Sequence, residues 1–147
     1  MQEELELGDR DSFKAATVLS GGVAGRGETC GALLGALMAL GLAMGRERMA
    51  DTDTYRRAMV PALELSRRFQ RALTASFGFE APLETTLCRD IHARLYGRAF
   101  DLTDPEDYQR FLAAGGHTAN GCPKVCAVAA RTAAEFLIGQ RPEGRPS

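Results

Sequence analysis

The sequence predicts an all-α protein, a compact bundle of five to six helices with a glycine-rich turn before the second helix. Three observations lead to this fold class. Alanine- and leucine-rich segments carry apolar residues at helical spacing, no segment alternates like a half-buried strand, and glycine or proline separates successive segments. The 147 residues suffice for one folded domain and are too few for two. We place that domain at 11–140, between an acidic segment at 1–10 and a loose tail at 141–147.

Start and stop signals place the individual helices. The first, at 11–19, ends at the glycine-rich turn, and the third has Asp51 or Asp53 as its N-cap. Pro61 should kink the third helix, because proline lacks an amide hydrogen. A short fifth helix follows Asp104 and Pro105, an N-cap with proline in the first turn. The predicted ranges of the second, third, fourth and last helices are 28–44, 52–77, 85–96 and 122–138.

Charge and hydropathy exclude several classes of function. With 18 Lys plus Arg against 19 Asp plus Glu, the net charge is −1, so we expect neither nucleic acid nor an anionic membrane surface as a partner. The longest apolar run, Gly31–Met44, is shorter than the roughly 20 residues that a bilayer requires. The acidic N-terminus has no apolar signal core, so we expect a cytoplasmic protein. In that compartment cysteines more often bind metal or undergo redox reactions than form permanent disulfides.

The second predicted helix is unusually rich in glycine. Each interior glycine costs a helix about 1 kcal/mol relative to alanine, so a compensating contact is expected. Gly31 and Gly35, and likewise Gly41 and Gly45, are four residues apart and share a face of the helix. Close helix packing or a dimer interface explains such pairs, and a cofactor lying against bare backbone is the alternative.

The positions of the four cysteines are the main functional signal. Cys30, Cys88 and Cys122 each fall at the start of a predicted helix, where the helix dipole and free amides favour a thiolate and lower the thiol pKa. Cys126 lies one turn after Cys122, so their β-carbons are about 5–6 Å apart on one helix face. These thiolates could therefore bind one metal or cluster. The alternative is that each cysteine is simply a small buried apolar group.

Other residues could assist such a site. His117, five residues before Cys122, and His92, one turn after Cys88, are reserve metal ligands, although we expect His92 to lie at the surface and His117 in a solvated loop. The turn at 21–27 lacks the Gly-Lys-Ser/Thr ending of a phosphate loop, so nucleotide binding is not expected. We expect this turn to place Arg26 and Gly31 beside the sulfur atoms, where hydrogen bonds to sulfur tune a cluster potential.

Three segments together resemble a known family. They read GGVAGRGETCGALLGALMALGLAMG from Gly21, TLCRDIHARLYG from Thr86 and GCPKVCAVAARTAAEFL from Gly121. The chain, over about 11–138, looks like the redox-active proteins named for their C_GCAxxG_C_C cysteine signature. This resemblance implies an α-helical protein with a thiol-based redox or iron–sulfur site, common in anaerobic bacteria, and a related domain occurs in split-Soret cytochromes. One feature departs from the family: its first cysteine lies in an N-terminal helix, and nothing upstream of Cys30 supplies it here.

From the residues and the resemblance together we predict a redox-active protein that binds an iron–sulfur cluster, preferably with two irons, for electron transfer. The predicted ligands are Cys30, Cys88, Cys122 and Cys126, with Cys126 in place of the missing cysteine; a three-cysteine site is the alternative. Three other functions stay open: a zinc site in the same thiolates, a cofactor-free thiol oxidoreductase, and a helical homodimeric module with inert thiols. The expected partners are an unidentified redox protein and a second copy of the chain.

Overall fold

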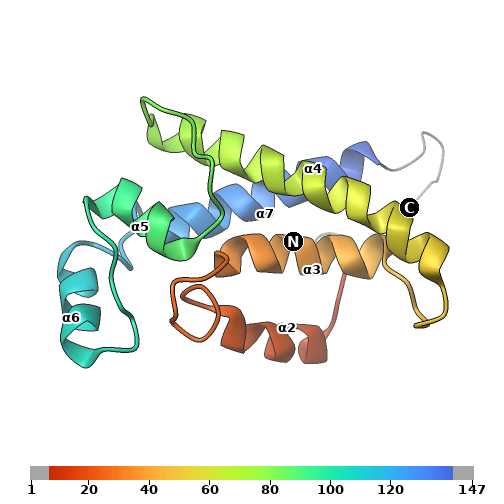
Figure 1. The fold of residues 1–147 in the computed structure, drawn as a ribbon, viewed down its shortest axis with the longest axis horizontal. Helices are drawn as coiled ribbons and strands as arrows, with labels where there is room; N and C mark the ends of the chain where they lie inside the picture. Colours follow the sequence, from red (N-terminus) through yellow and green to blue (C-terminus); the bar gives the residue numbers. More distant parts are fainter. Residues whose placement is uncertain (1–6, 141–147) are drawn as a thin grey trace.

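The computed structural model describes residues 7–140, and in this range it contains six α-helices, one short 3₁₀ helix and no strand (Figure 1). The all-α prediction is therefore confirmed. The helices are α2 (Arg10–Ala16), η1 (Thr17–Leu19, 3₁₀), α3 (Gly31–Met44), α4 (Thr52–Phe77), α5 (Cys88–Tyr96), α6 (Pro105–Ala113) and α7 (Cys122–Gly139). The tail predicted at 141–147 and most of the acidic segment lie outside the described residues.

Side-chain caps begin three of the helices. Asp9, Asp51 and Asp104 each accept a hydrogen bond from an amide three residues later. The α2 helix consequently begins at Arg10, inside the segment that the sequence assigned to the acidic lead. Two helices begin three residues later than predicted, α3 at Gly31 and α5 at Cys88. The reason is that the residues before them pair with each other instead of continuing a helix.

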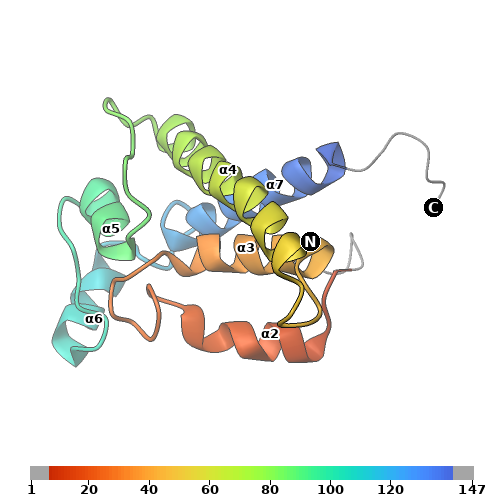
Figure 2. The ribbon, with the colours of Figure 1, turned by 45° about the vertical axis from the view of Figure 1, so that its right-hand side comes forward.

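The core lies between α3, α4 and α7, which contact one another in pairs. Figures 1 and 2 show α4 crossing α3 and α7, which run alongside each other. The α4 helix contributes Leu65, Phe69 and Leu73, which recur every fourth residue on its inner face and are buried. Facing them are Leu33 and Leu40 of α3 and Val125, Ala129, Ala133 and Phe136 of α7. The helical periodicity of the sequence is thus the periodicity of the core.

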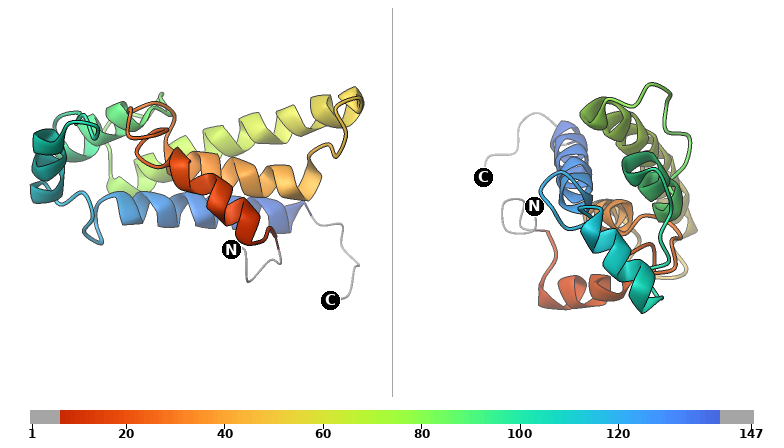
Figure 3. Two further views of the ribbon diagram at one scale, coloured as in Figure 1. Left: turned by 90° about the horizontal axis from the view of Figure 1, so that it is seen from below. Right: turned by 90° about the vertical axis from the view of Figure 1, so that its left-hand side faces the viewer.

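Two parts of the chain pack around this core. The α5 and α6 helices lie at one end of the bundle, where α3 and α7 begin, and α2 lies along the outside of α3 (Figure 3). No residue of α2 is buried. The consequence for function is that the N-terminal ends of α3, α5 and α7 gather at one end of the molecule.

The glycines of α3 differ in their surroundings. A methyl group added at Gly31 would lie 2.5 Å from the carbonyl oxygen of Leu19, so this glycine allows η1 to approach the helix. A methyl group added at Gly35 or Gly41 would meet nothing within 4 Å in the described part of the chain. Close packing therefore explains Gly31, and a dimer interface at the other glycines stays a prediction.

The α4 helix runs unbroken from Thr52 to Phe77 with Pro61 inside it. Proline at this position leaves the carbonyl of the preceding turn without its usual amide donor.

Among residues 7–140 there is no helix with both the length and the apolar character that a membrane crossing requires.

Replacing Phe69 by alanine should destabilise the protein by about 3–5 kcal/mol, because this ring is fully enclosed between α4 and its neighbours. The matched control is Phe13→Ala on α2, where the ring is 69% exposed and the expected change is within about 0.5 kcal/mol. Urea unfolding of both variants measures the difference. Equal losses of stability would contradict the assignment of the core.

Candidate functional site

The glycine-rich loop between η1 and α3 is closed by its own backbone. The amides of Val23 to Glu28 donate to carbonyl groups of residues 18–23. Val23 and Ala24 have φ angles of 61° and 54°, which are unfavourable for residues with a β-carbon, above all for β-branched valine. Because these amides are already bonded, the loop offers no cradle of free donors for a phosphate group.

A short backbone ladder joins this loop to the start of α5. The amide of Cys30 donates to the carbonyl of Thr86 at 2.8 Å, and the amide of Cys88 donates to the carbonyl of Glu28 at 2.6 Å. Thr29 and Leu87 between them form an isolated antiparallel bridge. The ladder therefore places Cys30 beside Cys88, although the two are far apart in sequence.

Contacts with α5 and α6 fix the start of α7. The amide of Cys122 donates to the carbonyl of Gly116 at 2.9 Å, and the hydroxyl of Tyr96 lies 3.8 Å from the Cys122 sulfur. The Phe111 ring lies directly against Gly116, where a β-carbon would collide with it. Cys122 and, one turn later, Cys126 are consequently held at the end of the bundle that carries Cys30 and Cys88.

All four cysteines line one cavity of about 320 Å³, which we call the thiol cavity. Cys30 and Cys88 are buried, Cys122 is half-buried and Cys126 is exposed, and all four are free thiols. The other lining residues include Gly31, Ile91, His92, Leu102, Phe111, His117 and Val125. Within residues 7–140, no three His, Cys, Asp or Glu side chains converge closely enough to hold a single metal ion. The thiols thus surround a space instead of meeting at a point.

His92 is the residue whose position the sequence analysis misjudged most. It is 2% exposed, and its Nε2 lies 3.5 Å from the sulfur of Cys88 and 3.5 Å from the sulfur of Cys122. The expected surface position is wrong because His92 shares the inner face of α5 with Cys88, whereas Arg94 lies on the outer face. The sequence held a useful signal: His92 is the fourth residue after Cys88, so both lie on one helix face.

Aromatic rings fix the plane of the His92 imidazole. The Phe111 ring stacks on the imidazole, with 5.0 Å between the ring centroids and an interplanar angle of 22°. The rings of Tyr96 and Phe100 lie edge-on to the imidazole. Burial lowers the pKa of His92 and so favours the neutral imidazole. Its Nδ1 has no hydrogen-bond partner among the described residues.

The other two assisting residues are placed differently. His117 is exposed, as expected, and lines the thiol cavity with its ring edge-on to Phe111 at 5.4 Å. The expectation that Arg26 lies beside the sulfur atoms is wrong. Arg26 is exposed and lines a separate surface depression together with Arg89 and Asp101. The carbonyls that follow it in the loop bond to α5, so backbone occupies the inner side of the loop.

The predicted lowering of the thiol pKa values is also wrong, because burial raises the pKa of all four cysteines. At Cys88, burial first and the neighbouring thiols second raise the pKa to about 12. The start of α5 does little to stabilise a Cys88 thiolate, because the amides of Cys88 and Arg89 already donate to loop carbonyls. Only Cys30 gains helix amides, those of Ala32 and Leu33, and they offset part of the effect of burial.

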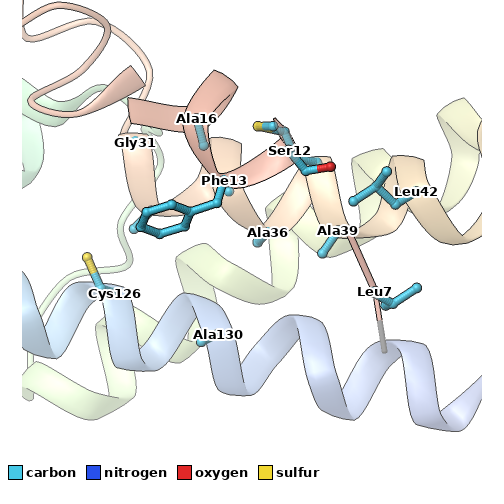
Figure 4. Close-up of a pocket in the computed structure, with 13 residues that line it drawn as sticks. Leu7, Ser12, Phe13, Ala16, Gly31, Ala36, Ala39, Leu42, Cys126 and Ala130 are labelled. Carbon is cyan, nitrogen blue, oxygen red and sulfur yellow. The ribbon is translucent and has the colours of Figure 1, made fainter. Parts of the chain in front are cut away.

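An apolar crevice adjoins the thiol cavity. It has a volume of about 220 Å³, lies between α2, α3 and α7, and shares Gly31 and Cys126 with the thiol cavity. Figure 4 shows Phe13 of α2 and Cys126 of α7 on opposite sides of this crevice. Cys126 is therefore the thiol through which the site meets the surface.

Comparison with known proteins gives one kind of match. A family model described as "Putative redox-active protein (C_GCAxxG_C_C)" matches residues 1–136. No curated protein and no solved structure matches the chain. The resemblance seen in the cysteine and glycine motifs is thereby confirmed over most of the sequence.

The contact between Gly22 and Cys88 predicts a specific effect of substitution. Gly22 has a φ of 72°, and an added methyl group would lie 2.6 Å from the Cys88 β-carbon. Gly22→Ala should destabilise the protein by about 2–5 kcal/mol, from backbone strain together with overpacking. Gly78→Ala is the matched control, since Gly78 has a φ of 66° but open space around it, and should cost about 1–2 kcal/mol. Urea unfolding compares the two variants; equal costs would show that Gly22 does not support Cys88.

The raised pKa of Cys88 predicts how stability changes with pH. A thiol whose pKa is higher in the folded than in the unfolded protein stabilises the fold below the unfolded value of 9.0. That stability is lost as the pH rises towards the folded value of about 12. Unfolding of the reduced, cofactor-free protein from about pH 8 to about pH 11 should show this decline, with a shallower slope in Cys88→Ala. An unchanged slope in the variant would contradict the prediction.

Proposed function

The chain belongs to the C_GCAxxG_C_C family of redox-active proteins, and on this basis we propose that it binds a two-iron iron–sulfur cluster and transfers electrons. The proposed ligands are Cys30, Cys88, Cys122 and Cys126. The observation that carries the proposal is the gathering of these four thiols, from three helices, around one cavity. In the reaction, one electron passes from a reduced partner protein to an oxidised one, and no covalent bond to substrate forms or breaks.

The donor set fits a cluster of this kind. Thiolates are the soft ligands that iron–sulfur clusters require, and a two-iron cluster needs four of them. Each iron of such a cluster would bind two of the four cysteines, so the four sulfurs need not meet at one point. This suits thiols that surround a cavity without forming a single-ion group within residues 7–140.

The surrounding residues have definable tasks at such a site. Ile91, Phe111 and Val125 present apolar surface to the cavity and exclude water. The amides of Ala32 and Leu33 can donate hydrogen bonds to the Cys30 sulfur. Cys126, which is exposed and borders the crevice, lies on the side that a partner protein can approach. When bound, the cluster supplies one-electron redox chemistry.

The alternative functions have less support. Zinc in a structural site needs four ligands around one ion, and no three candidates converge in this way in the described part of the chain. A cofactor-free thiol oxidoreductase needs a thiolate nucleophile, whereas burial raises the pKa of every cysteine and keeps it protonated at neutral pH. A bound metal cation would instead favour the thiolate form of these cysteines, because metal ligation deprotonates a thiol outright.

The direct test of the proposal is anaerobic purification of the full chain, followed by absorption spectroscopy and analysis of iron and acid-labile sulfide. The expected result is a coloured protein with about two irons and two sulfides per chain. A colourless protein with stoichiometric zinc would replace the proposal by the zinc site. A protein with neither metal after reconstitution with iron and sulfide would refute cofactor binding.

Cys126 is the ligand whose assignment depends most on this chain alone. Cys126→Ser should lower cluster content by at least half after identical reconstitution, because serine is a poorer ligand for iron in such clusters. Ala127→Ser is the matched control, since Ala127 is exposed on the same turn of α7 and lines neither cavity. Iron and sulfide analysis of both variants gives the answer. A full cluster in Cys126→Ser would show that the fourth ligand is another residue.

A further inference from the structure

The buried imidazole of His92 lines the thiol cavity but is not one of the proposed cluster ligands. His92 is almost fully enclosed, and its Nε2 is equally distant, at 3.5 Å, from the sulfurs of Cys88 and Cys122. A polar side chain buried in an apolar wall costs free energy unless it forms hydrogen bonds. The two sulfurs are its only hydrogen-bond contacts among residues 7–140.

We propose that His92 is a positioning residue that donates its Nε2 hydrogen to the sulfurs of both Cys88 and Cys122, and that it does not itself bind iron. The inference rests on the proposed cluster and deepens it, because it names the residue that sets the reduction potential of that cluster. Ligated thiolates can only accept a hydrogen bond, so the nitrogen facing them must carry the hydrogen.

The far side of the ring decides between donor and ligand. A histidine that binds metal through Nε2 carries its hydrogen on Nδ1, and that hydrogen almost always goes to a carboxylate, a carbonyl or water. The aromatic rings of Tyr96, Phe100 and Phe111 pack around the imidazole, and no acceptor from the described chain reaches Nδ1. If His92 bound metal through Nε2, its Nδ1–H would be a buried donor without an acceptor. If His92 carries its hydrogen on Nε2, that hydrogen forms hydrogen bonds to the two sulfurs.

The aromatic packing makes this donor rigid. Phe111 stacks on one face of the imidazole, and Tyr96 and Phe100 contact its edge, so the ring cannot turn Nε2 away without disturbing all three. Hydrogen bonds to ligating sulfurs withdraw charge from a cluster and favour its reduced state. His92 should accordingly raise the reduction potential.

Two substitutions and one control test the donor role. His92→Phe keeps a ring against Phe111 but removes the donor, and should shift the midpoint potential to more negative values. His92→Gln restores an N–H at about the same reach and should return the potential towards that of the wild type. Phe136→Leu removes a buried ring that lines neither the crevice nor the thiol cavity, and should keep the wild-type potential. An unchanged potential in His92→Phe would overturn the proposal, as would strong nitrogen hyperfine coupling in the reduced wild type, which marks direct ligation.

A measurement on the cofactor-free chain keeps the donor role separate from the cluster. The sequence contains two histidines, so long-range ¹H–¹⁵N correlation spectra of ¹⁵N-histidine-labelled protein resolve both, and His117→Gln assigns them. The expected tautomer of His92 carries its hydrogen on Nε2; a hydrogen on Nδ1 would overturn the proposal. If the wild type takes up no iron, the proposed function fails, while the Nε2–H tautomer would still show that the His92 hydrogen is on the nitrogen that faces the Cys88 and Cys122 sulfurs. This spectrum also decides the matter if His92→Phe fails to fold.

Discussion

The backbone ladder between residues 27–30 and 86–89 is the interaction on which the site depends. It ends the glycine-rich loop, sets the first residue of both α3 and α5, and brings Cys30 next to Cys88. The same hydrogen bonds occupy the amides that would otherwise stabilise a thiolate at the start of α5. This constraint thus explains why Cys30 and Cys88 lie together, and why the start of α5 does little to offset the burial that raises the pKa of Cys88.

The fold was largely predictable because its core follows the helical period of the sequence. Capping by Asp51 and Asp104, the range of α4 and the gathering of cysteines at helix starts all agree with local signals. The ladder was not predictable, because it joins two segments that carry no strand pattern and pair over only a few residues. For this reason the predicted starts of α3 and α5 are three residues too early and the predicted lowering of the thiol pKa values is wrong.

The positions of the side chains around the thiols also could not be predicted from the local sequence. His92 was assigned to the surface because Asp90 and Arg94 lie nearby in sequence, and Arg26 was assigned to the sulfur site because it belongs to the turn before Cys30. The burial of His92 depends instead on which face of α5 meets α7, and the exposure of Arg26 on which side of the loop meets α5, and these are tertiary contacts. A histidine enclosed by three aromatic rings and two sulfurs, and an arginine directed to solvent, follow from that packing.

Burial of the thiols gives the site its chemical character. Neutral thiols in an apolar cavity react slowly by themselves, and in the proposed site a positively charged iron centre would supply the charge that converts them to ligands. X-ray absorption at the iron edge of the anaerobically purified chain tests this most directly. The account predicts a first shell of sulfur alone together with scattering from a second iron. A first shell of nitrogen or oxygen without a neighbouring iron would contradict it.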